Sequence, residues 1–277
     1  MPRTDPVVVM GFCLEGDDGR KYFVKNAAFP TTTSLIIEIS PALDRQFIAK
    51  IGSGLPPFLN GALLMLDSSS KPAYIYEWCN TTLMQVAFPA FDASLSELVT
   101  LTVTLGVVNV QLVTEDPYSS SGGDASTGTN TNANRLSGIS VKTINSPLST
   151  RGKTRVSSSE VRHSGRRQDP MVAFLFVVKI DGIDTPFLKR IDPLSVGQGG
   201  TYTLVLTGSE TNITPFRTWL TSGGKKAGKI EYLDTSMKVA YRSEFTGLSI
   251  QSIYPVFPSG GNATVTMTFD SMIFYPV

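Results

Sequence analysis

Residues 66–74 read Leu66-Asp67-Ser68-Ser69-Ser70-Lys71-Pro72-Ala73-Tyr74, and residues 233–241 read Leu233-Asp234-Thr235-Ser236-Met237-Lys238-Val239-Ala240-Tyr241. The two stretches match at an offset of 167 residues (234 − 67), which Glu77 and Glu244 keep. Further along, Gln85-x-x-Phe88-Pro89-x-Phe91 recurs as Gln251-x-x-Tyr254-Pro255-x-Phe257, at an offset of 166. At that offset, Val99-Thr100-Leu101-Thr102-Val103 matches Val265-Thr266-Met267-Thr268-Phe269. Three blocks in one order at near-constant spacing indicate an internal duplication.

The repeat extends toward the N-terminus. Phe12 matches Phe176 at an offset of 164, and Phe47 matches Phe216 at an offset of 169. The drift in offset predicts a few loop insertions and deletions between the copies. Each copy is then about 110 residues long, a typical size for one domain. We predict a first copy over 1–116, a second copy over 169–277, and a connecting segment over 117–168.

Most of each copy has the pattern of β-strands. The run from Val172 to Ile180 is rich in β-branched and aromatic residues and ends at the turn signal Asp181-Gly182. In the last block of the second copy, Val265, Met267 and Phe269 alternate with threonines, which predicts a strand with one apolar face. The predicted fold class is mainly β, with two tandem β-sandwich or small-barrel domains.

Each copy is also predicted to contain one short helix. In the first copy Ser40 is the expected N-cap, Pro41 the first helical residue, and Gly52 or Gly54 the end. In the second copy Thr214 is the expected cap and Pro215 follows it, with the end at Gly223. Phe216 and Leu220 lie four residues apart and are expected to pack together on the sheet.

The composition suits a folded chain with no global attraction to nucleic acid. The 277 residues are 41% hydrophobic and 17% charged, with a net charge of +1. The segment 117–168 is rich in Ser, Gly and Thr, and it is expected to be a flexible basic linker. Its arginines, Arg166 and Arg167 among them, are candidates for docking on an acidic neighbouring subunit. No secretory signal is visible, and no apolar stretch reaches the roughly 18–20 residues that span a bilayer.

The search for chemistry predicts no catalytic, cofactor-binding or metal-binding residues, and hence no enzyme. The single histidine, His163, lies in the linker beside serines but without a rigid scaffold for a nucleophilic site. Asp17-Asp18-Gly19 is expected to be a hairpin turn rather than a calcium loop. Gly197–Gly200 and Gly223–Lys226 lack the context of a phosphate-binding motif. Cys13 and Cys79 are too few for a disulfide framework and are expected to be buried thiols.

A family resemblance is carried by the repeated blocks. Phe174-x-Phe176-x-Val178-x-Ile180-Asp181-Gly182 resembles the first strand and turn of the phage and contractile-injection tail tube family. The helix with Phe216 and Trp219 resembles the single helix of that family. The segment from Asp234 through Tyr254-Pro255 to Phe269 resembles its last two strands. The resemblance is weaker in the first copy, which has Asp17-Asp18-Gly19 where the family has Ile-Asp-Gly.

The resemblance implies a structural virion protein. It implies a tail tube subunit, assembled in the host cytoplasm, whose rings stack around a channel for DNA or effectors. Rings of that family usually contain six domains, so three duplicated chains are favoured over six. Tail sheath, tape measure and baseplate proteins are the implied partners, and DNA is expected to pass without specific binding.

Assembly contacts are expected to come from aromatic residues and prolines. The candidates are Phe12, Phe176, Trp219, Phe88, Pro89, Tyr254 and Pro255, together with Arg166 and Arg167. Two alternative functions stay open. One is a baseplate hub or tube initiator of the same machine, and the other is a β-sandwich protein that binds glycans or receptors.

Overall fold

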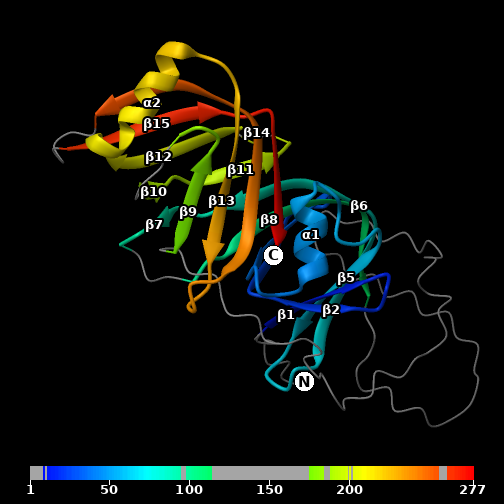
Figure 1. Cartoon of the computed structure of the whole chain (residues 1–277). Helices are drawn as coiled ribbons and strands as arrows, with labels where there is room; N and C mark the ends of the chain where they lie inside the picture. The colour runs from blue at the N-terminus through cyan, green and yellow to red at the C-terminus, as the bar shows by residue number, and fades with distance from the viewer. Residues whose placement is uncertain are drawn as a thin grey trace, which may run out of the picture. The chain divides into compact units, whose positions relative to one another are not determined.

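The computed structural model describes residues 9, 11–94, 98–113, 175–183, 188–198, 200, 202–255 and 261–277, without the side chain of Pro30. The predicted linker, with His163, Arg166 and Arg167, lies outside the described residues. The described chain is mainly β, in two antiparallel eight-stranded sheets with one helix each (Figure 1). The predicted fold class of two β domains is confirmed.

The first copy contributes eight strands and the helix α1. Their bounds are β1 Gly11–Gly16, β2 Lys21–Val24, β3 Asn26–Thr31, β4 Ser34–Ile39, α1 Arg45–Gly52, β5 Gly61–Leu66, β6 Pro72–Phe88, β7 Phe91–Asp92 and β8 Leu101–Val113. Seven of these strands form one sheet in the order β2-β1-β5-β6-β8-β4-β3. The remaining strand, β7, joins the sheet of the second copy.

The second copy contributes the other eight strands and the helix α2. Their bounds are β9 Phe176–Ile180, β10 Leu188–Ile191, β11 Leu194–Gly197, β12 Thr203–Ser209, α2 Glu210–Ser222, β13 Lys226–Leu233, β14 Val239–Pro255, β15 Asn262–Thr268 and β16 Ser271–Pro276. The sheet order is β7-β10-β12-β15-β14-β13-β9, with β16 on β14. In Figure 1 the yellow α2 lies over β12 and β15, which it contacts.

The repeated sequence Leu-Asp-x-Ser forms the same tight turn in both copies. The Asp67 carboxylate accepts the N–H groups of Ser69 and Lys71 at 2.8 and 3.0 Å. The Asp234 carboxylate accepts the N–H groups of Ser236 and Lys238 at 2.8 and 2.9 Å. An aspartate that bonds the backbone two residues on fixes such a turn locally. This local chemistry explains why the block is so similar in the two copies.

Strand register gives the equivalence of the two copies directly. β6 and β14 each have 17 residues. The first residues of the two strands, and likewise their last residues, are separated by 167 positions in the sequence. Phe12 lies opposite Met65 and Phe176 lies opposite Tyr232, so the predicted offset of 164 at the N-terminal strand is confirmed.

Two of the predicted matches are wrong in register. The offset of 167 holds to the end of β14, which places Tyr254 level with Ala87 and Pro255 level with Phe88. A single-residue slip turns a side chain to the other face of a sheet, so the Phe88-Pro89 and Tyr254-Pro255 pairs are not equivalent in space.

The last block is shifted further. Leu83 of β6 pairs with Leu105 of β8, and the equivalent Ile250 of β14 pairs with Met267 of β15. Leu105 and Met267 are therefore equivalent, so the offset between β8 and β15 is 162 rather than the predicted 166. The shift is even, and apolar residues alternate with threonine through both strands. The sequence pattern therefore fits equally well at either offset.

Both predicted helices exist, but their predicted starts are wrong. α1 begins at Arg45, and the carboxylate of its N-cap Asp44 accepts the N–H of Phe47 at 2.9 Å. α2 begins at Glu210 with Ser209 as N-cap, so Pro215 lies inside the helix. The two helices end at Gly52 and at the left-handed Gly223, as predicted. Proline marks a helix start only where no better capping side chain lies nearby, and here Asp44 follows Pro41 while Ser209 precedes Pro215.

The expected packing of Leu220 is also wrong. Ile213, Phe216 and Trp219 form the buried face of α2, whereas Leu220 is 43% exposed. The helix uses a row of residues three apart, so the fourth residue after Phe216 turns toward solvent.

Candidate functional site

The two copies exchange strands. Phe91 and Asp92 of β7 pair antiparallel with Ile191 and Arg190 of β10. The N–H of Ala93 extends this ladder by donating to the carbonyl of Lys189 at 2.9 Å. A strand of the first copy therefore closes an edge of the second copy's sheet. We call the whole contact between the copies the intrachain seam.

The exchange is reciprocal, because β11 of the second copy pairs with the end of β6. Leu194 lies opposite Phe88 and Gly197 opposite Gln85, and the N–H of Gln198 donates to the carbonyl of Met84 at 2.6 Å. β11 lies where the offset between the copies rises from 164 to 169. The corresponding part of the first copy is only the turn between Thr31 and Ser34. The predicted insertion is thus the strand that joins the copies.

Aromatic rings fill the seam beneath these strands. Phe88 meets Phe274 edge-on, with ring centroids 5.0 Å apart, and Phe91 lies 4.7 Å from Tyr232. Phe274 also stacks on Tyr241 at 5.7 Å. The buried apolar side chains of both copies form one continuous cluster. Such burial of large rings stabilises the seam by the hydrophobic effect and by ring–ring geometry.

The helix α1 is held in the seam as well as on its own copy. It contacts β16 of the second copy, and Ile48 and Ile51 are fully buried. A Cβ atom added to Gly52 would lie 1.7 Å from the carbonyl oxygen of Phe274. Glycine is thus required at this position by close approach of two backbones.

The structure brings some of the predicted assembly residues to the seam and not others. Phe88 is buried there, and Phe176 lies 6.4 Å from Phe91, centroid to centroid. Phe12 packs on the core of the first copy. Trp219 is buried on the inner face of α2 and donates its indole N–H to the carbonyl of Gly224 at 3.0 Å. Pro89 is half-buried.

Tyr254 and Pro255 lie at the exposed end of β14. The side chain of Tyr254 is 64% exposed. Phe274, Gly52 and β11 were missed as contributors to the seam. The only sequence signal for them was the change of offset around β11.

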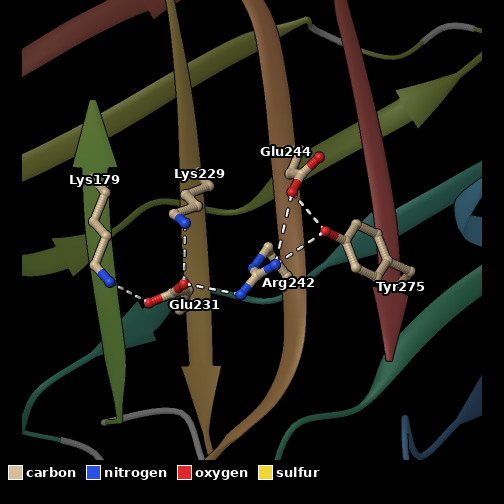
Figure 2. Close-up of polar contacts among 6 residues, drawn as sticks. All are labelled: Lys179, Lys229, Glu231, Arg242, Glu244 and Tyr275. Atoms are coloured by element: carbon tan, nitrogen blue, oxygen red, sulfur yellow. Dashed lines mark hydrogen bonds and ion pairs between the residues drawn. The ribbon is translucent and has the colours of Figure 1, made fainter. Parts of the chain in front are cut away.

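The second feature of the structure is a cluster of charged side chains on one face of β9, β13, β14 and β16 (Figure 2). Glu231 at its centre is 6% exposed. The Glu231 carboxylate lies 2.7 Å from the Lys179 ammonium, 3.4 Å from that of Lys229 and 3.1 Å from the Arg242 guanidinium. The Tyr275 hydroxyl donates to Glu244 at 2.5 Å, and Glu244 lies 3.9 Å from Arg242. We call this the charged face.

The equivalent row of the first copy is apolar. The register places Cys13, Leu64, Ile75 and Val113 where the second copy has Val177, Glu231, Arg242 and Tyr275. Cys13 and Leu64 are buried, and burial raises the pKa of the Cys13 thiol to about 11. The two copies therefore share a backbone but differ in the chemistry of this face.

Glu231 makes the stability of the second copy sensitive to acid. Burial raises the pKa of this carboxyl, but hydrogen bonds and charge from Lys179 and Lys229 outweigh burial and hold the pKa below its usual value of 4.5. A carboxyl with a lowered pKa stabilises the fold above that usual value, and the contribution is lost as pH falls through the folded-state pKa.

We expect Glu231→Gln to lower the free energy of unfolding by about 1–2 kcal/mol at neutral pH, because its lysine partners are partly exposed. The difference from the wild type should shrink below about pH 4. Urea unfolding across this pH range measures both effects. Glu15→Gln, which removes a surface pair with Lys21 at 3.7 Å, is the matched control and should have little effect. A pH-independent loss in Glu231→Gln would contradict the electrostatic explanation.

Gly197 offers a test of the β11–β6 pairing. Its φ is +111°, and an added Cβ would lie 2.2 Å from the carbonyl oxygen of Met84. We expect Gly197→Ala to speed amide hydrogen exchange in Gln85–Phe88 by about tenfold or more, because the strands must separate. Gly224→Ala has a similar positive φ of +91° but open space around it, so it controls for backbone strain. Equal protection of β6 in the two variants would contradict the pairing.

Within the described ranges, no three His, Cys, Asp or Glu side chains come close enough together to hold a metal ion. Among the same residues, no helix has the length and apolar character needed to cross a membrane. No protein-family model matches the chain, and no curated protein is significantly similar to it.

Proposed function

We propose that the chain is a structural subunit of a phage or contractile-injection tail tube, forming stacked rings around a central channel. The proposal rests on the intrachain seam. Two copies of one β domain meet there through different surfaces: the first copy presents α1 and the end of β6, and the second presents β10 and β16. A contact between unlike surfaces of like units is heterologous, and its repetition gives rings or filaments.

The duplication favours three chains in each ring. The resemblance of the repeated blocks to tail tube proteins implies six domains per ring, and each chain supplies two. Sheath, tape measure and baseplate proteins are the proposed partners, and DNA or effectors pass through the channel. A channel that lets DNA slide requires few cation contacts with phosphate, because those contacts dominate affinity for nucleic acid.

The test is electron microscopy of the purified full chain, with native mass spectrometry of the assembled species. Stacked rings of three chains support the proposal, and rings of six chains would overturn the trimer. Isolated rings that never extend into tubes would favour a hub or tube initiator. A stable monomer that binds a glycan array would favour the receptor-binding alternative.

A further inference from the structure

We propose that a second seam between neighbouring chains repeats the intrachain seam, with the second copy of one chain docking on the first copy of the next. This inference rests on the proposed function, since it assigns the lateral contact of the proposed ring. The partner is another molecule of this same protein. The strand registers identify the residues on both sides.

The docking surface on the second copy is found from the offset of 167 between β6 and β14 and the offset of 169 between α1 and α2. The edge of β6 at Gln85–Phe88, which β11 covers, corresponds to Ser252–Pro255 of β14. Among the described residues, no strand pairs with that part of β14 on the side away from β15. An unpaired strand edge exposes backbone N–H and C=O groups that can pair with a strand of another chain, and natural proteins usually cover or shorten such edges. The exposed Tyr254 lies on this same strand end.

The two helices also differ in whether a neighbouring domain covers them. Ile51 of α1, 1% exposed, is covered in part by β16, whereas its equivalent Leu220 of α2 is 43% exposed. An exposed leucine alone means little, but here the matching position in the same chain is buried by a neighbouring domain. The free surface of α2 and the free end of β14 together match the surface that the first copy uses in the intrachain seam.

The surface on the first copy follows from the offsets of 164 and 162. β10, which β7 covers, corresponds to β3, and β3 is the terminal strand of its sheet in the described structure. Phe274 of β16, fully buried against α1 and its neighbours, corresponds to Leu112 of β8, which is half-buried. The second seam therefore brings Leu220 of one chain toward Leu112 of the next.

The second seam cannot be as close as the first. Thr221 stands in α2 where α1 has Gly52, and an added Cβ at Gly52 already overlaps the carbonyl oxygen of Phe274. The first copy also lacks the insertion that forms β11. Helix and strand must therefore stand further apart between chains than within one. A looser contact suits subunits that fold first and associate afterwards.

The test uses two singly substituted full chains, Leu220→Cys and Leu112→Cys, both in a Cys79→Ser background. The chains are mixed, allowed to assemble and treated with a short bismaleimide. We expect covalent dimers from the mixture and none from either variant alone, which is the signature of a head-to-tail contact. Met237→Cys mixed with Leu112→Cys is the matched control, because Met237 is 63% exposed at the far end of the β13–β14 hairpin.

A charge at the seam gives a second readout. Leu220→Lys should weaken ring formation by about tenfold or more, while Met237→Lys should leave it unchanged. Rings without mixed cross-links, or dimers from one variant alone, would overturn this seam and leave the tube proposal standing. A chain that stays monomeric at every concentration would overturn the tube proposal and the seam with it.

Discussion

Replacing Phe274 with alanine is expected to lower the free energy of unfolding by about 3–5 kcal/mol, the range for deleting a fully buried aromatic side chain. Phe274 is 0% exposed and contacts the rings of Phe88, Tyr232 and Tyr241. Because it belongs to the second copy and Phe88 to the first, its loss removes packing within one copy and between the two.

We expect the wild type to unfold in one cooperative step and Phe274→Ala to unfold in two, as the copies lose their coupling. Urea unfolding followed by tryptophan fluorescence reports both copies, since Trp78 lies in the first and Trp219 in the second. Ile273→Ala is the matched control, because Ile273 is the neighbour of Phe274 in β16 and its side chain is 49% exposed. A single unshifted transition in Phe274→Ala would contradict the role assigned to the seam.

Replacing Gly52 with alanine is expected to have the second large effect. It should lower the stability of the fold, although helix propensity alone would raise it. Alanine is favoured over glycine within a helix by about 1 kcal/mol. The added Cβ, however, would lie 1.7 Å from the Phe274 carbonyl oxygen, which is backbone and cannot rotate away. We expect a net loss of about 2 kcal/mol or more, and a fall of at least roughly 4–8 °C in Tm.

Differential scanning calorimetry of Gly52→Ala measures this loss. Gly11→Ala is the control, because its nearest atom is a leucine methyl 3.9 Å away, an ordinary contact. A Gly52→Ala protein as stable as the wild type would mean that α1 and β16 do not approach each other as closely as described.

Much of the fold was predictable because its signals are local. The Asp67 and Asp234 turns depend on side-chain bonds within five residues, and both were visible as repeated sequence. Strand alternation gave the faces of β8 and β15 correctly. It did not give their register, since a period of two fits every even shift equally well.

The seam was not predictable for a different reason. The small size of Gly52 matters only because Phe274, far along the chain, comes beside it. The pairing of β11 with β6 likewise depends on how the two domains pack, which no local pattern records. The change of offset marked the place of the insertion but not its partner. Helix starts failed because Asp44 and Ser209 outcompete the residues before Pro41 and Pro215 as caps.

The difference between the charged face and its largely apolar counterpart has a consequence for anything that binds the proposed ring. In a ring of three chains, six similar domains alternate in surface chemistry, so the Glu231 network recurs at every other position. A partner with threefold symmetry meets three identical charged patches. A partner with sixfold symmetry meets two kinds of surface in turn, and half of its contacts must be different from the rest.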